Sequence, residues 1–279
     1  MEVQVLKEHY LDNSATTQVL PQVAQMAVRM MTEEYGNPSS LHTRGFRARK
    51  LLEEARGQVA QRLGAQPEEI TFTSGGTESN NLAIFGAAQA RKRMGNKIVT
   101  TAAEHDSVLG PCRALEKQGF EVVYLKPDAS GHLSEEELVQ AIDQRTILVS
   151  VMLVNNETGA IFPVEAASRA IRRSKAPALL HVDAVQGFGK LPFTVKKLGA
   201  DLLTISGHKI HAPKGIGGLY VKKGVRILPH TLGGGQEKGL RSGTESAPLI
   251  CALGEAVRLL PPAQEALERF LADVPVNAA

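Results

Sequence analysis

The sequence contains no tryptophan and only two cysteines, Cys112 and Cys251, among its 279 residues. Two cysteines make a disulfide framework implausible and exclude a cysteine-rich zinc site, so we expect no metal centre and a reducing, cytoplasmic setting. The opening residues MEVQVLKEHYLDNS lack the cationic and apolar pattern of a signal peptide, and no apolar run reaches about 18 residues. The sequence therefore predicts neither a secretion signal nor a membrane span.

An excess of either charge is also lacking, because 32 Lys and Arg residues nearly balance 29 Asp and Glu residues and leave a net charge of +3. A charge this small does not indicate a nucleic-acid-binding surface. The hydrophobic fraction of 43% and the charged fraction of 22% are ordinary for a soluble globular protein. The length suits one large domain or two smaller ones.

Short apolar runs alternate with longer helical patterns along most of the chain. Strands are expected at residues 69–74, 97–101, 121–125, 146–154, 178–183, 201–206 and 217–221. Helices are expected at residues 44–63, 78–93, 106–118, 134–143 and 163–174. Several runs are apolar on both faces, as expected when helices cover both sides of a sheet. We therefore predict an α/β fold with a mostly parallel central sheet covered by helices.

The C-terminal stretch differs because it contains helical patterns and no strands. Residues 247–260 form one such pattern, Pro261 and Pro262 break it, and residues 264–274 form a second one. We expect this stretch to be the start of a further domain that is cut short.

Polar residues follow several of the expected strands at the point where each strand ends. They are Thr73 to Thr77, Glu104 and His105, Asn155 to Glu157, Asp183 with Gln186, and Ser206 to Lys209. In open α/β sheets, ligands bind beyond the carboxyl ends of the strands. The set therefore predicts one binding site.

Residues 71–88, TFTSGGTESNNLAIFGAA, are typical of a strand, a Ser-Gly-Gly-Thr turn and a helix. Gly75 and Gly76 allow a close backbone approach, and the free amides and dipole of the helix N-terminus favour an anion such as phosphate. Neither the Walker loop nor the dinucleotide fingerprint is present. The alternative is an ordinary strand-to-helix turn with Thr77 as the cap.

Asp183 and Lys209 are charged residues that each follow an apolar strand. A carboxylate at the position of Asp183 needs a partner, such as a cationic ring nitrogen. A lysine held among apolar groups has a lowered pKa, and its neutral amine forms a Schiff base with an aldehyde. The alternatives are a surface aspartate and a solvated loop lysine. Together with a phosphate cradle, the two residues make the parts of a pyridoxal-phosphate site.

Eight motifs in a fixed order over nearly the whole chain carry a resemblance to a known family. They are YLDNSATT, YGNPSSLH, TSGGTESNN, AEHDSV, VNNETG, HVDAVQ, SGHKIHAPKGIGGLYV and GGGQEKGLRSGTE. The chain resembles the cysteine desulfurases, in the class V aminotransferase group of fold-type I pyridoxal-phosphate enzymes. The resemblance implies a cofactor-binding large domain at residues 16–247, a small-domain segment at 1–15, and the start of a truncated small domain at 248–279.

The resemblance also implies a role for each matching residue. Lys209 would bind the cofactor aldehyde, Asp183 would hold the pyridinium nitrogen, and His105 would stack on the ring. Thr244 would reach the phosphate bound by a partner subunit, which implies a homodimer with shared sites. The other implied contacts are those of Asn156 and Gln186 with the ring oxygen and of Gly76, Thr77, Ser206 and His208 with the phosphate.

The implied reaction converts L-cysteine to L-alanine and passes sulfur to an acceptor or scaffold protein for iron–sulfur cluster or thio-cofactor assembly. The resemblance implies that the acceptor cysteine lies on a loop well downstream of RSGT, and we expect neither that loop nor the arginine for the substrate carboxylate among the residues after Thr244. Cys112 at a helix start and Cys251 in an apolar pattern are not expected to replace it. Three functions stay open: a desulfurase, a cofactor-binding protein or dimer partner without sulfur transfer, and another class V activity such as an aminotransferase or selenocysteine lyase.

Overall fold

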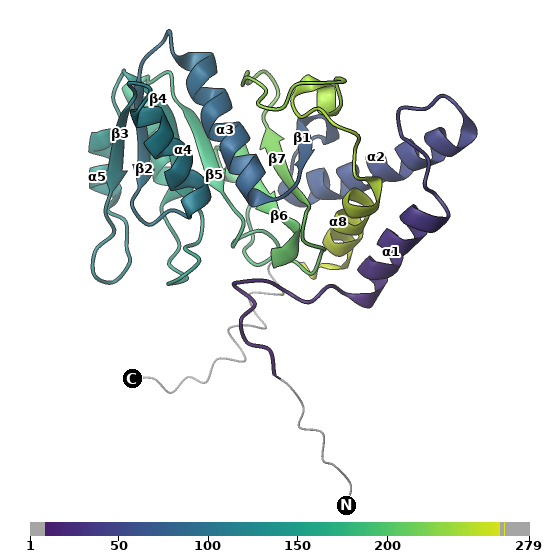
Figure 1. Ribbon diagram of the computed structural model, residues 1–279. Coiled ribbons are helices and arrows are strands. Elements are labelled where there is room, and N and C mark those ends of the chain that lie inside the picture. Colours follow the sequence, from purple (N-terminus) through teal and green to yellow (C-terminus); the bar gives the residue numbers. More distant parts are fainter. Residues whose placement is uncertain (1–8, 263–264, 266–279) are drawn as a thin grey trace, which may run out of the picture.

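The predicted strands form one mixed sheet in the computed structural model, which describes residues 9–262 and 265. They are β1 (Ile70–Thr73), β2 (Lys97–Thr101), β3 (Glu121–Leu125), β4 (Thr146–Met152), β5 (Leu179–Asp183), β6 (Leu202–Ser206) and β7 (Gly217–Val221). Their order is β1-β7-β6-β5-β4-β2-β3 (Figure 1). Among these strands, β7 alone runs opposite to the others, so the prediction of a mostly parallel sheet is confirmed.

The predicted helices are also present. Predicted and additional helices together are α1 (Pro21–Thr32), α2 (Thr43–Leu63), α3 (Gly76–Arg91), α4 (Asp106–Glu116), α5 (Glu135–Ala141), α6 (Val164–Ser174), α7 (Val195–Leu198) and α8 (Ala247–Leu259). Short 3₁₀ turns add η1 (Pro67–Glu69), η2 (Gly207–Lys209) and η3 (Glu237–Gly239). The prediction for residues 264–274 lies, apart from Glu265, outside the described residues.

Helices α1 and α7 are additional to those predicted from the sequence. Helix α1 begins with Pro21 in its first turn and buries Val23, Ala27 and Met30, which are spaced by four and three residues along one helical face. This spacing was the available signal. Helix α7 is a single turn of four residues, capped by Thr194, and is too short for a periodic pattern to reveal it.

Strands β4, β5 and β6 are buried on both faces, whereas edge strand β3 is only partly buried, which explains why several strands are apolar on both faces. Consecutive residues Leu202 and Leu203 of β6 belong to two different hydrophobic clusters. Helices α3 and α4 supply one cluster, and α5 and α6 contribute to the other. Helix α8 packs against α1 and α2 at one end of the molecule (Figure 1). The division into residues 1–15, 16–247 and 248–279 stays a prediction.

The sheet brings the ends of several strands to a common edge. Strands β2, β4, β5 and β6 are parallel, so their carboxyl ends, including Asp183 and Ser206, lie at the same side of the sheet. Strand β1 runs in the same direction because it pairs with the other edge of antiparallel β7, and it leads into α3 at that side.

None of the helices among residues 9–262 combines the length and apolarity needed to cross a bilayer.

Candidate active site

A cavity of about 520 Å³ opens at the carboxyl edge of the sheet. Nine of the ten predicted site residues line it: Gly76, Thr77, His105, Asn156, Asp183, Gln186, Ser206, His208 and Lys209. Thr244 does not line this cavity and is exposed. The structure thus gathers residues from the ends of β1, β2, β4, β5 and β6 around one space.

The N-terminus of α3 forms one wall of the cavity. The helix begins at Gly76, and its N-cap is Gly75, which has φ 152° and provides no side-chain cap for the first-turn amides. The alternative with Thr77 as the cap is therefore wrong. A Cβ at Gly76 would lie 3.0 Å from Cγ2 of Val185 and 3.5 Å from Cβ of Ser206, so only glycine fits without pressing on this wall. Uncapped amides at a helix N-terminus favour an anion.

Lys209 lies in η2, directly after β6, and its ammonium group faces the N-terminal segment of the chain. Nζ donates hydrogen bonds to the carbonyl oxygens of Ser14 and of Ala15, the latter at 2.8 Å. Burial lowers the pKa of Lys209, although the charges of Asp12 and Asp183 act in the opposite direction. The amine is thus held in place by backbone acceptors, with its neutral form favoured by burial.

Asp183 ends β5 and is only 5% exposed. Its Oδ1 accepts a hydrogen bond from the Val185 amide at 2.9 Å, and its Oδ2 accepts one from Nδ2 of Asn80 at 2.7 Å. Burial raises the pKa of Asp183, while these hydrogen bonds and the positive charge of Lys209 oppose the rise. A cation in the cavity would add the partner that a buried carboxylate needs.

His105 is the N-cap of α4, and Ser107 determines which nitrogen of its neutral ring carries the hydrogen. The Ser107 amide donates to Nδ1 of His105 at 3.1 Å, and Oγ of Ser107 lies 2.8 Å from the same nitrogen. Because a backbone amide is always a donor, Nδ1 is an acceptor, and the hydrogen of the neutral ring is on Nε2. The Ser107 hydroxyl in turn accepts from Nδ2 of Asn80 at 2.8 Å.

Three further polar side chains of the cavity, those of Gln186, Asn156 and His208, contact other groups of the protein. Gln186 donates to the Ser14 carbonyl at 2.9 Å and accepts from Lys190 at 3.1 Å. Asn156 donates to Glu157 at 2.6 Å, and Nδ1 of His208 lies 3.2 Å from Oγ1 of Thr16. Burial, followed by the nearby Lys209 and Lys214 charges, lowers the pKa of His208.

Glu104, which precedes His105, is buried and does not line the cavity, and burial raises its pKa to about 8. Its Oε1 accepts from the Met152 amide at 2.7 Å and from Oγ1 of Thr101 at 3.1 Å. These bonds tie the segment before His105 to the ends of β2 and β4.

Sequence reasoning missed Asn80, Ser107 and Ser14. Asn80 follows Gly76 by four residues, so it lies on the same face of α3, and this spacing was the signal that could have identified it. Ser107 lies two residues after His105 in the motif AEHDSV. The Ser14 carbonyl could not be found this way, because any residue provides one.

The two cysteines lie outside the cavity and are buried. Burial raises the pKa of both thiols to about 12, so neither is a ready thiolate. Within residues 9–262 and 265, no group of three or more His, Cys, Asp or Glu side chains is placed to hold a metal ion.

The sequence of this chain is similar to those of several cysteine desulfurases. Cysteine desulfurase 2 of Trichormus variabilis is 51% identical over 252 residues, which are 90% of this chain and 62% of that protein. Cysteine desulfurase IscS 1 of Archaeoglobus fulgidus is 45% identical over 250 residues, 90% of this chain and 65% of that protein. The chain therefore spans less than two thirds of the length of these relatives.

Solved structures share the fold. A NifS-like protein superposes with a TM-score of 0.90 at 42% identity, covering 94% of this chain and 71% of its own. The structure described as SspA in complex with cysteine gives a TM-score of 0.87 at 39% identity, covering 95% and 78%. The family model for class-V aminotransferases matches residues 9–269. The chain belongs to the class-V aminotransferase family.

Proposed function

We propose that the chain binds pyridoxal phosphate at Lys209 and takes part in the desulfuration of L-cysteine to L-alanine. Pyridoxal phosphate is the cofactor of this family. The similar curated proteins are cysteine desulfurases, and one of the similar structures is a complex with cysteine. A desulfurase is therefore favoured over the other class V activities.

The side chains of the cavity fit the two ends of this cofactor. The glycine cradle and uncapped amides of α3, with Ser206 and His208 opposite, suit a phosphate group. Asp183 suits a protonated ring nitrogen, because its buried carboxylate gains the cation that it needs. Asn156 and Gln186 would hydrogen-bond the ring oxygen, and His105 would stack on the ring.

When bound, the cofactor supplies an electron sink that weakens the bonds to the α- and β-carbons of an amino acid. The chain supplies binding and proton control. Lys209 would hold the aldehyde carbon and, as a neutral amine, accept and return a proton at Nζ. Asp183 would keep the ring nitrogen positively charged, and His105 would present an N–H at Nε2.

Sulfur transfer requires an acceptor thiolate in addition to these groups. In the net reaction, the Cβ–Sγ bond of cysteine breaks, an S–S bond to the acceptor forms, and Cβ gains the proton that completes alanine. Cys112 and Cys251 do not supply this thiolate, because both are buried with raised pKa. We propose that the acceptor cysteine lies outside these 279 residues, since Cys112 and Cys251 are their two cysteines. We further propose that Thr244 reaches the phosphate site of a second copy and that the sulfur serves iron–sulfur cluster or thio-cofactor assembly.

The observation that carries the proposal is the meeting of Lys209, Asp183 and the N-terminus of α3 in one cavity. The test is borohydride reduction of the protein loaded with pyridoxal phosphate, followed by peptide mapping. We expect the cofactor on Lys209. Lys190 is the internal control, because its pKa is also lowered by burial and it contacts Gln186 of the same cavity. Labelling of Lys190, or of no lysine, would overturn the assignment.

A further inference from the structure

Glu78 carries a negative charge in the first turn of α3, next to the proposed phosphate cradle. It follows Thr77 directly and is the acidic residue of that turn. Its Oε2 accepts a hydrogen bond of 2.6 Å from the Ser74 amide. A carboxylate here favours the helix, because it complements the positive end of the helix dipole. It opposes a phosphate bound in the cavity, because both groups are anionic and Glu78 directly follows Thr77, which lines the cavity, although Glu78 itself does not.

Arg241 pairs with this carboxylate from a distant part of the chain. Nε of Arg241 donates to Oε1 of Glu78 at 2.8 Å, and the two side chains are only 27% and 23% exposed. Burial alone would raise the pKa of Glu78, but the hydrogen bonds from Arg241 and Ser74 lower it below its ordinary value. Glu78 is therefore charged at neutral pH, and Arg241 cancels that charge locally.

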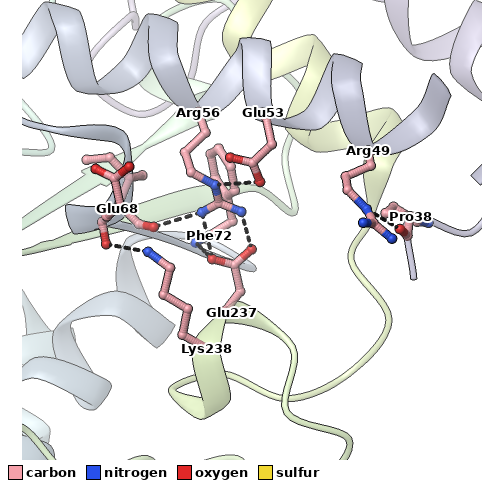
Figure 2. A network of polar contacts seen from close by, with 9 residues as sticks. Pro38, Arg49, Glu53, Arg56, Glu68, Phe72, Glu237 and Lys238 are labelled. Carbon is pink, nitrogen blue, oxygen red and sulfur yellow. Dashed lines mark hydrogen bonds and ion pairs between the residues drawn. The ribbon is translucent and has the colours of Figure 1, made fainter. Parts of the chain in front are cut away.

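The loop that carries Arg241 is held in place by a second, buried ion pair (Figure 2). Arg56 of α2 donates through both terminal nitrogens to the Glu237 carboxylate at 2.9 Å and also to the Ile70 carbonyl at 2.7 Å. Glu237 additionally accepts from the Phe72 amide at 3.0 Å. Lys238 donates to the Glu68 carbonyl at 2.8 Å.

These bonds attach η3 to α2 and β1. Glu237 and Lys238 have φ of 48° and 58°, a left-handed backbone conformation that residues other than glycine rarely adopt. The loop thus keeps a strained backbone where its carboxylate meets Arg56, and its course to Arg241 is fixed by the protein rather than by a ligand.

We propose that Arg241 is a positioning residue for the cofactor: by neutralising Glu78, it keeps the N-terminus of α3 able to accept a dianionic phosphate. This inference rests on the proposed function, because it concerns the phosphate of the same cofactor. Arg241 does not line the cavity and would act through its ion pair with Glu78. The Arg56–Glu237 pair keeps the loop where Arg241 reaches Glu78.

The test compares the affinities of pyridoxal phosphate and of pyridoxal, which lacks the phosphate, by equilibrium titration. Arg241→Met leaves Glu78 uncompensated, so we expect about five- to tenfold weaker binding of pyridoxal phosphate and unchanged binding of pyridoxal. Glu78→Gln removes the opposing charge and binds pyridoxal phosphate at least as well as the parent. The double variant Glu78→Gln/Arg241→Met returns to within about twofold of the parent.

The matched control is Arg145→Met, because Arg145 forms a 2.8 Å ion pair with Glu121 on an exposed surface outside the cavity. It should change neither affinity. A double variant as weak as Arg241→Met would show that Arg241 contacts the phosphate itself and would overturn the inference. Equal loss for both ligands would reveal general damage and would also overturn it. If the parent binds the cofactor at Lys209 and Arg241→Met matches the parent, only this inference fails; if the parent does not bind there, the proposed function fails first.

Discussion

Asn80 donates a hydrogen bond of 2.7 Å to the carboxylate of Asp183, although 103 positions separate the two residues in the chain. Its second amide hydrogen goes to Ser107 at 2.8 Å, and Ser107 lies beside Nδ1 of His105. One amide group therefore stabilises a carboxylate on one side and, through Ser107, an acceptor nitrogen on the other. The two side chains proposed to contact the cofactor ring from different directions share this support.

We predict that Asn80→Ala raises the pKa of Asp183, because the lost donor had stabilised the carboxylate. Pyridoxal phosphate should then bind about three- to tenfold more weakly, since a protonated Asp183 no longer attracts a cationic ring nitrogen. Titration of ¹³C-labelled aspartate by NMR, assigned with Asp183→Asn, measures the first effect. Titration with the cofactor measures the second.

Asn81→Ala is the control for this variant. Asn81 is the neighbouring asparagine, and its Nδ2 donates to the Thr77 carbonyl at 2.9 Å without reaching Asp183. The control should leave the Asp183 titration where it is in the parent. If Asn80→Ala also leaves it there, the bond between Asn80 and Asp183 contributes nothing to the charge of the carboxylate.

The fold could be predicted from the sequence because its signals are local. Strands such as β6 are apolar on both faces, and Ser134 caps α5 by accepting from the amide of Glu137, only three residues further along the chain. The partnership of Asn80 with Asp183 could not be predicted, because it depends on α3 lying across β5 after the whole sheet has formed. The residues around an asparagine inside a helix do not indicate which distant residue it will contact.

The site shows the same contrast. Lys209 and Asp183 could be singled out because a charge at the end of an apolar strand is unusual in its own neighbourhood. The carbonyl that accepts from both Lys209 and Gln186 belongs to Ser14, and a backbone carbonyl leaves no signature in the sequence. Arg241 and Glu78 lie 163 positions apart, so their pairing also required the three-dimensional structure.

We predict that neither cysteine reacts with a thiol reagent in the folded protein. Cys112 and Cys251 are 0% and 4% exposed, and the pKa of each is raised to about 12. Modification by iodoacetamide at pH 7.5, followed by mass spectrometry, should find both thiols unmodified, while urea should make both reactive. Rapid native labelling of one cysteine would mark it as an accessible thiol and would reopen its candidacy as a sulfur acceptor.

Glu104 should make stability depend on pH. Its pKa in the folded protein is about 8, above the ordinary value of 4.5, because burial disfavours the charged form. The folded state therefore binds more protons than the unfolded state between these values, and the stability contributed by Glu104 is lost as pH rises through this range. The Gln side chain of Glu104→Gln cannot ionise, so the variant does not lose this contribution. The difference in free energy of unfolding, variant minus parent, should therefore increase between pH 5 and pH 8. Urea unfolding of both proteins at pH 5 and at pH 8 measures this difference. The same difference at both pH values would contradict the prediction.

Arg56 has two acidic partners, which differ in their exposure to solvent. The Arg56 and Glu237 side chains are 8% and 4% exposed, whereas that of Glu53, which also bonds to Arg56 at 3.3 Å, is 55% exposed. Glu237→Ala leaves a buried guanidinium without its main counter-charge and the Phe72 amide without its acceptor, so we expect a loss of about 3–5 kcal/mol in the free energy of unfolding. Glu53→Ala removes a solvated charge and should cost at most about 1 kcal/mol.

The double variant Arg56→Met/Glu237→Ala separates the ion pair from the packing around it. Removing both charges leaves no buried ion without a partner, so the double variant should be more stable than Glu237→Ala alone, as measured by urea unfolding. The aliphatic part of Met can still cover the Phe72 ring, over which the guanidinium now lies at 4.8 Å. If the double variant is less stable than Glu237→Ala, the unpaired guanidinium is not the source of the loss, and Arg56 stabilises the loop mainly through its bond to the Ile70 carbonyl and its contact with Phe72.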